Sequence, residues 1–261
     1  MISKNQLKYV RQLEQKKWRK REEAFVAEGP KVVGDLLRAG FVPRMVFATK
    51  EWEGWKTESE KATGRRPRVG NEWAEVSDEE LRKLSFLQHP QQVLAIFELP
   101  EERILDCSTG TADTLTIALD GIQDPGNLGT IIRLADWFGI DTIVCSEDTA
   151  DAWNPKVVQA TMGSIARVNI VYTALPAYLA KATVPVYGTL LDGENISEQT
   201  LTTGGIIVMG NEGNGISEEV RQLVTRKLLI PAFREGAESL NVAIATAITC
   251  SEFKRRTNAV N

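Results

Sequence analysis

The second half of the sequence repeats one arrangement, in which an apolar segment runs into a polar turn and then a helix-forming stretch. The apolar segments are 114–121, 141–147, 167–172, 184–191, 204–213 and 226–233. Segments that are apolar on both faces and separated by helices are typical of parallel strands covered by helices on both sides. The sequence therefore predicts an α/β domain built on a parallel sheet.

The first hundred residues also alternate helices and strands. A helix is predicted from about 5 to 23 and another from Pro30 to Gly40, while Ser77 and Glu80 form a capping box for a third. Residues 50–73 give no firm assignment. Residues 100–113 have the composition of a linker. We therefore expect a smaller α/β domain at 1–105 and a larger domain at 106–261.

Composition narrows the possible chemistry. The chain of 261 residues is 43% hydrophobic and 25% charged, which is typical of a soluble globular protein. We expect no secretory leader and no membrane span, and the widely spaced cysteines favour the reducing cytoplasm. Three widely spaced cysteines argue against a disulfide framework or a zinc site. Because His89 is the only histidine, a Ser-His-Asp triad is disfavoured. We expect no metal.

Positive charge is concentrated at the N-terminus of a chain whose net charge is −4. Residues 1–21 hold eight lysines and arginines against one acidic residue, a net charge of +7. One interpretation is a solvated helix, and the other is a surface that binds a polyanion. The candidates for contacts with a polyanion are Lys16, Lys17, Arg19, Lys20 and Arg21. A second basic stretch surrounds Arg65, Arg66 and Arg68.

Three strands of the second half end in loops that carry polar side chains. The candidates are Asn127 and Arg133 in the first loop and its helix, Glu212 in the second, and Ser239 and Asn241 in the third. Each has an ordinary alternative: Asn127 and Ser239 could cap helices, Arg133 could pair with Asp136, and Glu212 could be solvated. Ligands of open α/β sheets bind beyond the carboxyl ends of strands, so three loops together predict one pocket.

This set of side chains lacks a thiol, an imidazole and a metal cage. It suits a reaction in which an activated cofactor is aligned with an acceptor, such as methyl transfer from a sulfonium. Hydrolysis or phosphoryl transfer would call for a metal or an acidic cluster.

The three segments resemble the three motifs of the SpoU (TrmH-type) RNA 2′-O-ribose methyltransferases, in the SPOUT class. The matching residues are Asn127, Gly129 and Arg133; Gly210, Asn211, Glu212 and Gly215; and Ile230, Pro231, Ser239, Leu240, Asn241 and Val242. Thr161 and Gly163 also match, and the likeness covers about residues 114–256. Residues 25–40 resemble the family's substrate-binding domain. The third loop departs from the family in carrying Arg234, Glu235 and Glu238.

The resemblance implies a deep trefoil knot, a homodimer through the C-terminal domain, and S-adenosyl-L-methionine as cofactor. It implies catalytic roles for Arg133, Asn127, Glu212, Ser239 and Asn241, with Arg133 also facing the RNA. The implied cofactor-binding residues are Thr189, Leu190, Met209, Gly210, Asn211, Glu212, Gly213, Ile230, Ser239, Leu240 and Asn241. The partner would be rRNA or tRNA.

Two questions stay open at this point. Arg133 is either a general base that works through a phosphate or a water, or a group that only orients the ribose, since a guanidinium stays protonated in proteins. A non-catalytic RNA-binding or ribosome-assembly protein that retains the fold is the alternative function. A nucleotide-binding oxidoreductase is disfavoured because the first loop lacks the G-x-G-x-x-G pattern.

Overall fold

The computed structural model describes residues 2–52, 72–101, 113–234 and 239–258. The chain forms two compact units: Met1–Glu101 with Asp151–Arg167 (unit 1), and Glu102–Ala150 with Val168–Asn261 (unit 2). Most of the predicted linker, the basic stretch at Arg65 to Arg68, and Glu235 and Glu238 lie outside the described residues.

Unit 1 is a small mixed sheet with helices. Its elements are α1 (Lys4–Gln12), α2 (Lys16–Glu22), β1 (Ala24–Glu28), α3 (Pro30–Arg38), β2 (Pro43–Ala48), β3 (Glu72–Glu75), α5 (Asp78–Leu84), β4 (Val93–Glu98), α7 (Pro155–Ala160) and η2 (Ser164–Ala166). The strand order is β1-β4-β2-β3, with β4 antiparallel to both of its neighbours. The capping box predicted at Ser77 and Glu80 is confirmed at α5.

The single helix predicted from about 5 to 23 is wrong, because the chain turns between α1 and α2. Leu13 is fully buried at the turn. The guanidinium of Arg19 donates to the Leu13 carbonyl at 2.8 Å and to the Glu14 carbonyl at 2.7 Å. These bonds satisfy carbonyls that a helix end leaves unpaired. A side chain from the second helix therefore stabilises the corner, which local helix propensity does not reveal.

The segment Asp151–Arg167 packs within unit 1 although it follows strands of unit 2 in the chain. The ring of Trp153 lies 4.6 Å from that of Phe25 and 6.2 Å from that of Phe41. Asp151 forms an ion pair with Arg19 at 2.5 Å. Unit 1 therefore depends on residues from both parts of the sequence.

Gly163, just before η2 in this segment, lies against Asp35 of α3. Its φ is +94°, and an added Cβ would lie 2.1 Å from Oδ2 of Asp35. Both the positive φ and the close approach exclude a larger side chain. Thr161, two residues earlier, is fully buried and donates from Oγ1 to the Val158 carbonyl at 2.7 Å.

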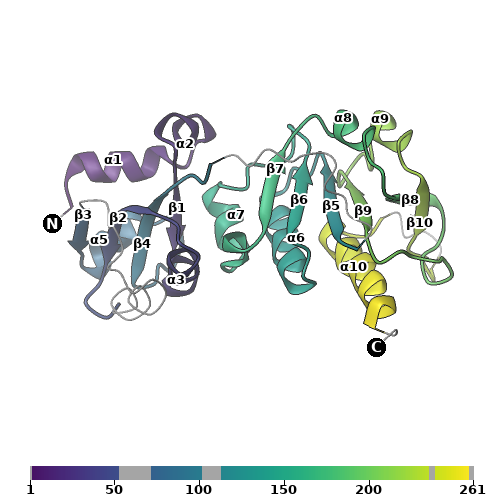
Figure 1. Cartoon of the computed structure of the whole chain (residues 1–261). Helices are drawn as coiled ribbons and strands as arrows, with labels where there is room; N and C mark the ends of the chain where they lie inside the picture. The colour runs from purple at the N-terminus through teal and green to yellow at the C-terminus, as the bar shows by residue number, and fades with distance from the viewer. Residues whose placement is uncertain (1, 53–71, 102–112, 235–238, 259–261) are drawn as a thin grey trace. The chain divides into compact units, whose positions relative to one another are not determined.

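Unit 2 contains the predicted parallel sheet (Figure 1). Its elements are β5 (Leu115–Asp120), α6 (Pro125–Trp137), β6 (Thr142–Cys145), β7 (Asn169–Tyr172), α8 (Leu175–Leu179), β8 (Val186–Asn195), β9 (Gly205–Gly210), α9 (Glu218–Arg221), β10 (Arg226–Leu229) and α10 (Val242–Asn258). The strand order is β10-β8-β9-β5-β6-β7, and every neighbouring pair is parallel.

Helices cover both faces of this sheet, as predicted. On one face, Val208 of β9 packs with Tyr178 of α8 and Val220 of α9. On the other, Tyr187 of β8 meets Phe253 of α10 edge to face, with ring centroids 4.9 Å apart. Burying a large apolar side chain contributes roughly 1.5–3 kcal/mol, so the two layers hold the strands firmly. The loops after β5, β9 and β10 consequently leave a rigid sheet at the same edge.

Candidate active site

In the first loop, Asp124 caps α6, which leaves the side chain of Asn127 free of that role. The Asp124 carboxylate accepts the Asn127 backbone N–H at 2.8 Å, and Pro125 occupies the first helical position. Both choices are favoured at helix starts. The alternative in which Asn127 caps the helix is therefore wrong, and its side chain is available for other contacts.

Glu212, in the loop after β9, joins the second loop to the first. Its Oε1 accepts from Nδ2 of Asn127 at 2.9 Å. The same carboxylate accepts the backbone N–H groups of Gln123 and Asp124, each at 3.4 Å. Although Glu212 is exposed, its carboxylate thus holds both the Asn127 side chain and the backbone that precedes α6.

Asn241 joins the third loop to the same point. Its Nδ2 donates to Oδ1 of Asn127 at 3.0 Å. Its Oδ1 accepts the N–H groups of Ala243 and Ile244, so Asn241 is the N-cap of α10. The Asn127 amide therefore lies between Glu212 and Asn241. These residues follow Asn127 in the sequence by 85 and 114 positions.

The other two candidate catalytic residues face outward. Arg133 lies two turns into α6, where it is exposed, and its guanidinium pairs with none of the described carboxylates, Asp136 included. Ser239 is exposed before α10, and because Asn241 caps that helix, the interpretation of Ser239 as the cap is wrong. Both side chains can reach a bound molecule without breaking a described contact.

Asn211 shapes the second loop. Its Nδ2 donates to the Gly121 carbonyl at 2.6 Å, and its Oδ1 accepts the N–H groups of Gly213 and Asn214 at 2.8 and 3.0 Å. A Cβ on Gly210 would lie 2.3 Å from the carbonyl carbon of Gly215, so the loop closes too tightly for any other residue there.

Two supporting residues escaped the sequence analysis. Asp120 ends β5, is 8% exposed, and accepts the Ser217 N–H at 2.7 Å through Oδ2. Ser146 follows β6, and its Oγ accepts the Gly121 N–H at 2.8 Å. The sequence could have indicated Asp120, because an acidic residue at the end of an apolar strand is unusual. The hydrogen bond of Ser146 could be found only from the three-dimensional structure.

The implied cofactor residues surround the ends of three neighbouring strands. The ladder between β8 and β9 ends at Gly188 and Val208. Thr189 lies just past this pair and donates from Oγ1 to the Val208 carbonyl at 3.4 Å. Met209 is buried, while Leu190 and Ile230 are half-buried. Apolar side chains gathered beside the point where two strands part fit an adenosine-containing ligand.

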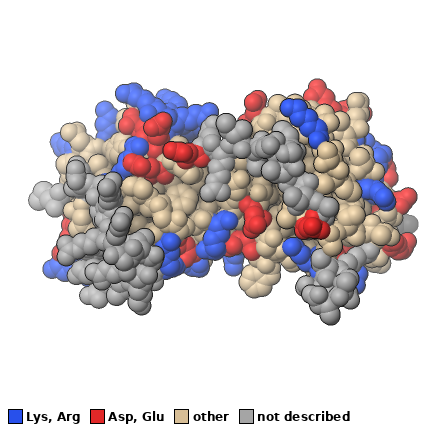
Figure 2. Space-filling view, in the orientation of Figure 1, with Lys and Arg blue, Asp and Glu red and all other residues tan. Residues whose placement is uncertain are grey.

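The basic N-terminal candidates divide into two kinds. Lys16, Lys17, Lys20 and Arg21 are exposed, and Figure 2 shows basic side chains gathered over α2. Arg19, however, is only 2% exposed and is held by Asp151 and two backbone carbonyls. Arg19 is therefore a structural residue, and its assignment as an RNA contact needs correction.

Two further properties concern the described residues only. They contain no group of three or more His, Cys, Asp or Glu side chains arranged to hold a metal ion. Their helices include none that is both long and apolar enough to cross a membrane.

Burial raises the pKa of the Cys145 thiol well above its usual range, and it raises the pKa of Cys250 to about 12. Neither thiol is therefore a ready nucleophile.

Comparison with known proteins decides the family. Residues 114–251 match the model of the SpoU rRNA Methylase family, and residues 4–95 match an MRM3-like substrate binding domain. The chain belongs to the SpoU rRNA methylase family. The first match contains all three loops described above.

Individual relatives extend over nearly the whole chain. The 23S rRNA (guanosine(2553)-2′-O)-methyltransferase of Bacillus subtilis is 32% identical over 94% of this chain and 95% of its own. A solved TrmH-family RNA methyltransferase from Porphyromonas gingivalis is 41% identical, with a TM-score of 0.83 over 98% of this chain and 99% of that one. The AdoMet-bound rRNA methyltransferase of Sinorhizobium meliloti is 30% identical, with a TM-score of 0.85 over 98% and 97%.

These matches confirm the predicted family and an SPOUT-type parallel-sheet domain preceded by a substrate-binding domain. The SpoU family uses S-adenosylmethionine, and the Sinorhizobium meliloti relative was crystallised with it. This chain is thus an RNA methyltransferase of the SpoU family.

Proposed function

We propose that this SpoU-family protein transfers a methyl group from S-adenosylmethionine to a ribose 2′-hydroxyl of rRNA or tRNA. The observation that carries the proposal is the chain of hydrogen bonds from Glu212 through Asn127 to Asn241, at 2.9 and 3.0 Å. It joins the three loops at the start of α6, the helix that also carries Arg133. The name of the Bacillus subtilis relative, a ribose methyltransferase, supports the same position of transfer.

Different residues of the site would bind the cofactor and the acceptor nucleotide. Thr189, Leu190, Met209 and Ile230 would hold the cofactor, together with Gly210, Asn211, Gly213 and the Ser239–Asn241 turn. When bound, S-adenosylmethionine supplies a methyl group on a sulfonium, which needs alignment more than covalent activation. Asn127, fixed on both sides, would orient the acceptor nucleotide, and the exposed Ser239 would contact the cofactor or the nucleotide.

Arg133 would orient the ribose and its phosphate. A guanidinium presents several donors in a planar fork and stays protonated, so it stabilises negative charge on the acceptor better than it removes a proton. The 2′-hydroxyl proton would then leave to a phosphate oxygen or to water. Glu212 acts on this arrangement through Asn127 and is therefore a positioning residue.

The family also suggests how the protein is assembled and where it works. We propose a homodimer through the C-terminal domain, a trefoil knot in that domain, a boundary between the domains near residue 105, and a cytoplasmic location. Exposed Ile244 and Ile248, 51% and 39% accessible, lie one turn apart on α10 and support a helix-mediated contact.

The test separates cofactor binding from methyl transfer. Arg133→Ala should lower the single-turnover rate of methyl transfer to an rRNA fragment about a hundredfold to a thousandfold, because charge stabilisation on the acceptor is lost. Calorimetry should show unchanged affinity for S-adenosylmethionine. Arg226→Ala, which removes another exposed arginine of unit 2, is the matched control and should leave both unchanged.

Wild-type protein that binds the cofactor and RNA yet transfers nothing would favour the non-catalytic alternative. Equal loss of cofactor affinity and transfer in Arg133→Ala would contradict the assigned role.

A further inference from the structure

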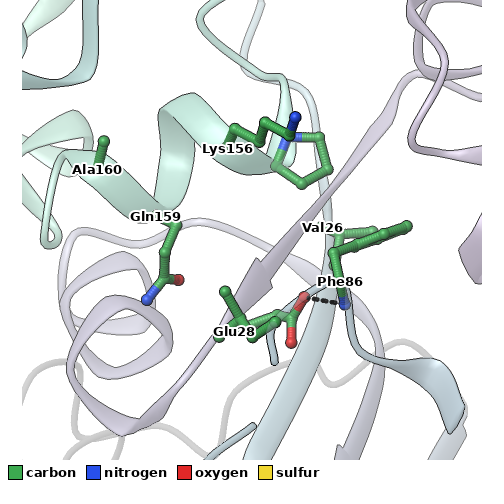
Figure 3. A pocket seen from close by; sticks show the side chains of 8 residues that line it. Val26, Glu28, Phe86, Lys156, Gln159 and Ala160 are labelled. Atoms are coloured by element: carbon green, nitrogen blue, oxygen red, sulfur yellow. Dashed lines mark hydrogen bonds between the residues drawn. The ribbon is translucent and has the colours of Figure 1, made fainter. Parts of the chain in front are cut away.

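A pocket of unit 1 shares no lining residue with the three loops. Its walls come from β1, from the residues after α5 and from α7 (Figure 3). Its volume is about 290 Å³. That is at the low end of the range for small-molecule sites, and it suits a single nucleotide better than a larger ligand.

The most unusual group in the pocket is the carboxylate of Glu28. Its side chain is 5% exposed, and it accepts the Phe86 N–H at 2.9 Å and the Ser85 hydroxyl. A carboxylate can accept about four hydrogen bonds, so one further position remains on each oxygen. Burial has the largest effect and leaves the pKa of Glu28 above its ordinary value, while these two hydrogen bonds and the charge of Arg11 offset it only in part. Further donors would stabilise this buried charge.

The rest of the lining complements a flat, partly polar molecule. Figure 3 shows the amide of Gln159 on α7 and the carboxylate of Glu28 at the same pocket. Gln159 is half-buried, and its side chain makes no hydrogen bond with the described residues. Phe86 and Val26 add apolar surface. Aromatic and amide groups of this kind stack on unpaired RNA bases and read their edges.

We propose that this pocket binds one unpaired guanine base of the RNA, an inference that rests on RNA being the substrate. Guanine alone among the four bases presents two adjacent donors, N1–H and the 2-amino group, which match the two oxygens of Glu28. Its O6 acceptor can take a hydrogen bond from the Gln159 amide. Lys156, exposed beside the pocket, supplies charge for the neighbouring phosphate.

The experiment measures base preference with the full-length protein. Fluorescently labelled oligouridylates carrying one central guanosine, inosine or adenosine are titrated, and anisotropy gives each dissociation constant. The guanosine probe should bind about tenfold more tightly than the adenosine probe, which is the usual effect of a bidentate base contact. Inosine, which lacks the 2-amino group, should fall between them.

Three substitutions locate the preference. Glu28→Gln should bring the guanosine and inosine probes to equal affinity. Ala160→Phe narrows the pocket from α7 without changing Glu28 and should also remove the preference for guanosine. Lys156→Gln should weaken all three probes by a similar factor and reduce the salt dependence, because it removes a phosphate contact. Thermal unfolding confirms that each variant is folded.

Equal affinity of the wild-type protein for all three probes would overturn the proposal, as would a preference that persists in a folded Ala160→Phe variant. Cofactor binding and methyl transfer are measured on the same preparations. If they remain while base preference is absent, only the pocket assignment fails. If transfer itself is absent from the wild-type protein, the proposed function fails instead.

Discussion

The loops of unit 2 and the basic helix α2 of unit 1 are both rich in polar side chains, but they are organised differently. In unit 2, Asn127 is bonded on one side to Glu212 and on the other to Asn241. In α2, four of five neighbouring cations are exposed, while Arg19 is buried against Asp151. A site is therefore recognisable by contacts between distant segments, whereas a run of like charges can contain both solvent-facing and structural members.

The largest expected effect concerns the independence of the two regions. A fragment beginning at Ala112 contains all three motifs, and the sequence boundary alone suggests that it folds. In the structure, however, Asp151–Arg167 belongs to unit 1, and its Val157, Val158 and Ile165 are buried. Exposing each costs roughly 1.5–3 kcal/mol, a total comparable with the stability of a whole domain.

We therefore expect the fragment either to aggregate or to unfold at a temperature well below the melting temperature of the full-length protein. Size-exclusion chromatography and thermal circular dichroism measure this, and co-expression of residues 1–101 should restore solubility. A monodisperse fragment with the melting temperature of the full chain would show that the regions are independent and that Asp151–Arg167 is dispensable for folding.

A smaller effect separates the two kinds of cation in α2. Arg19→Ala leaves the Asp151 carboxylate and two carbonyls without their partner and should destabilise the protein by about 3 kcal/mol. Lys20→Ala, on the exposed side of the same helix, should change stability by less than about 0.5 kcal/mol. Urea unfolding gives both values. Similar losses in the two variants would remove the distinction drawn here.

The smallest effect is on RNA affinity. Replacing Lys16, Lys17, Lys20 and Arg21 by Gln should weaken binding of an rRNA fragment and flatten its salt dependence, since each phosphate contact contributes a slope of roughly 0.7–0.9. Affinity for S-adenosylmethionine should not change, because these residues lie in unit 1. An unchanged salt slope would mean that α2 is simply a solvated helix.

Much of unit 2 was predictable because its signals are local. Strands that are apolar on both faces imply covering helices, and the three motifs fall at strand ends, where Asn127, Glu212 and Asn241 do converge. The roles of single residues were less predictable. Several polar residues can cap a helix, so the sequence did not show that Asp124 and Asn241, rather than Asn127 and Ser239, are the caps.

Unit 1 was predicted less well because long-range contacts decide it. The turn between α1 and α2 depends on Arg19, whose ion-pair partner Asp151 lies 132 residues away. The inclusion of Asp151–Arg167 depends on the aromatic contacts of Trp153 with Phe25 and Phe41. Neither hydrophobic periodicity nor helix propensity carries such information.

The central claim is that the three converging loops form a site for ribose methyl transfer, and isotope labelling tests it most directly. Total RNA is incubated with the protein and S-adenosylmethionine carrying a deuterated methyl group, digested to nucleosides, and analysed by mass spectrometry. We predict a labelled 2′-O-methyl nucleoside with the wild-type protein and none above background with Arg133→Ala. Label on a base instead of a ribose, or equal labelling by the two proteins, would contradict the claim.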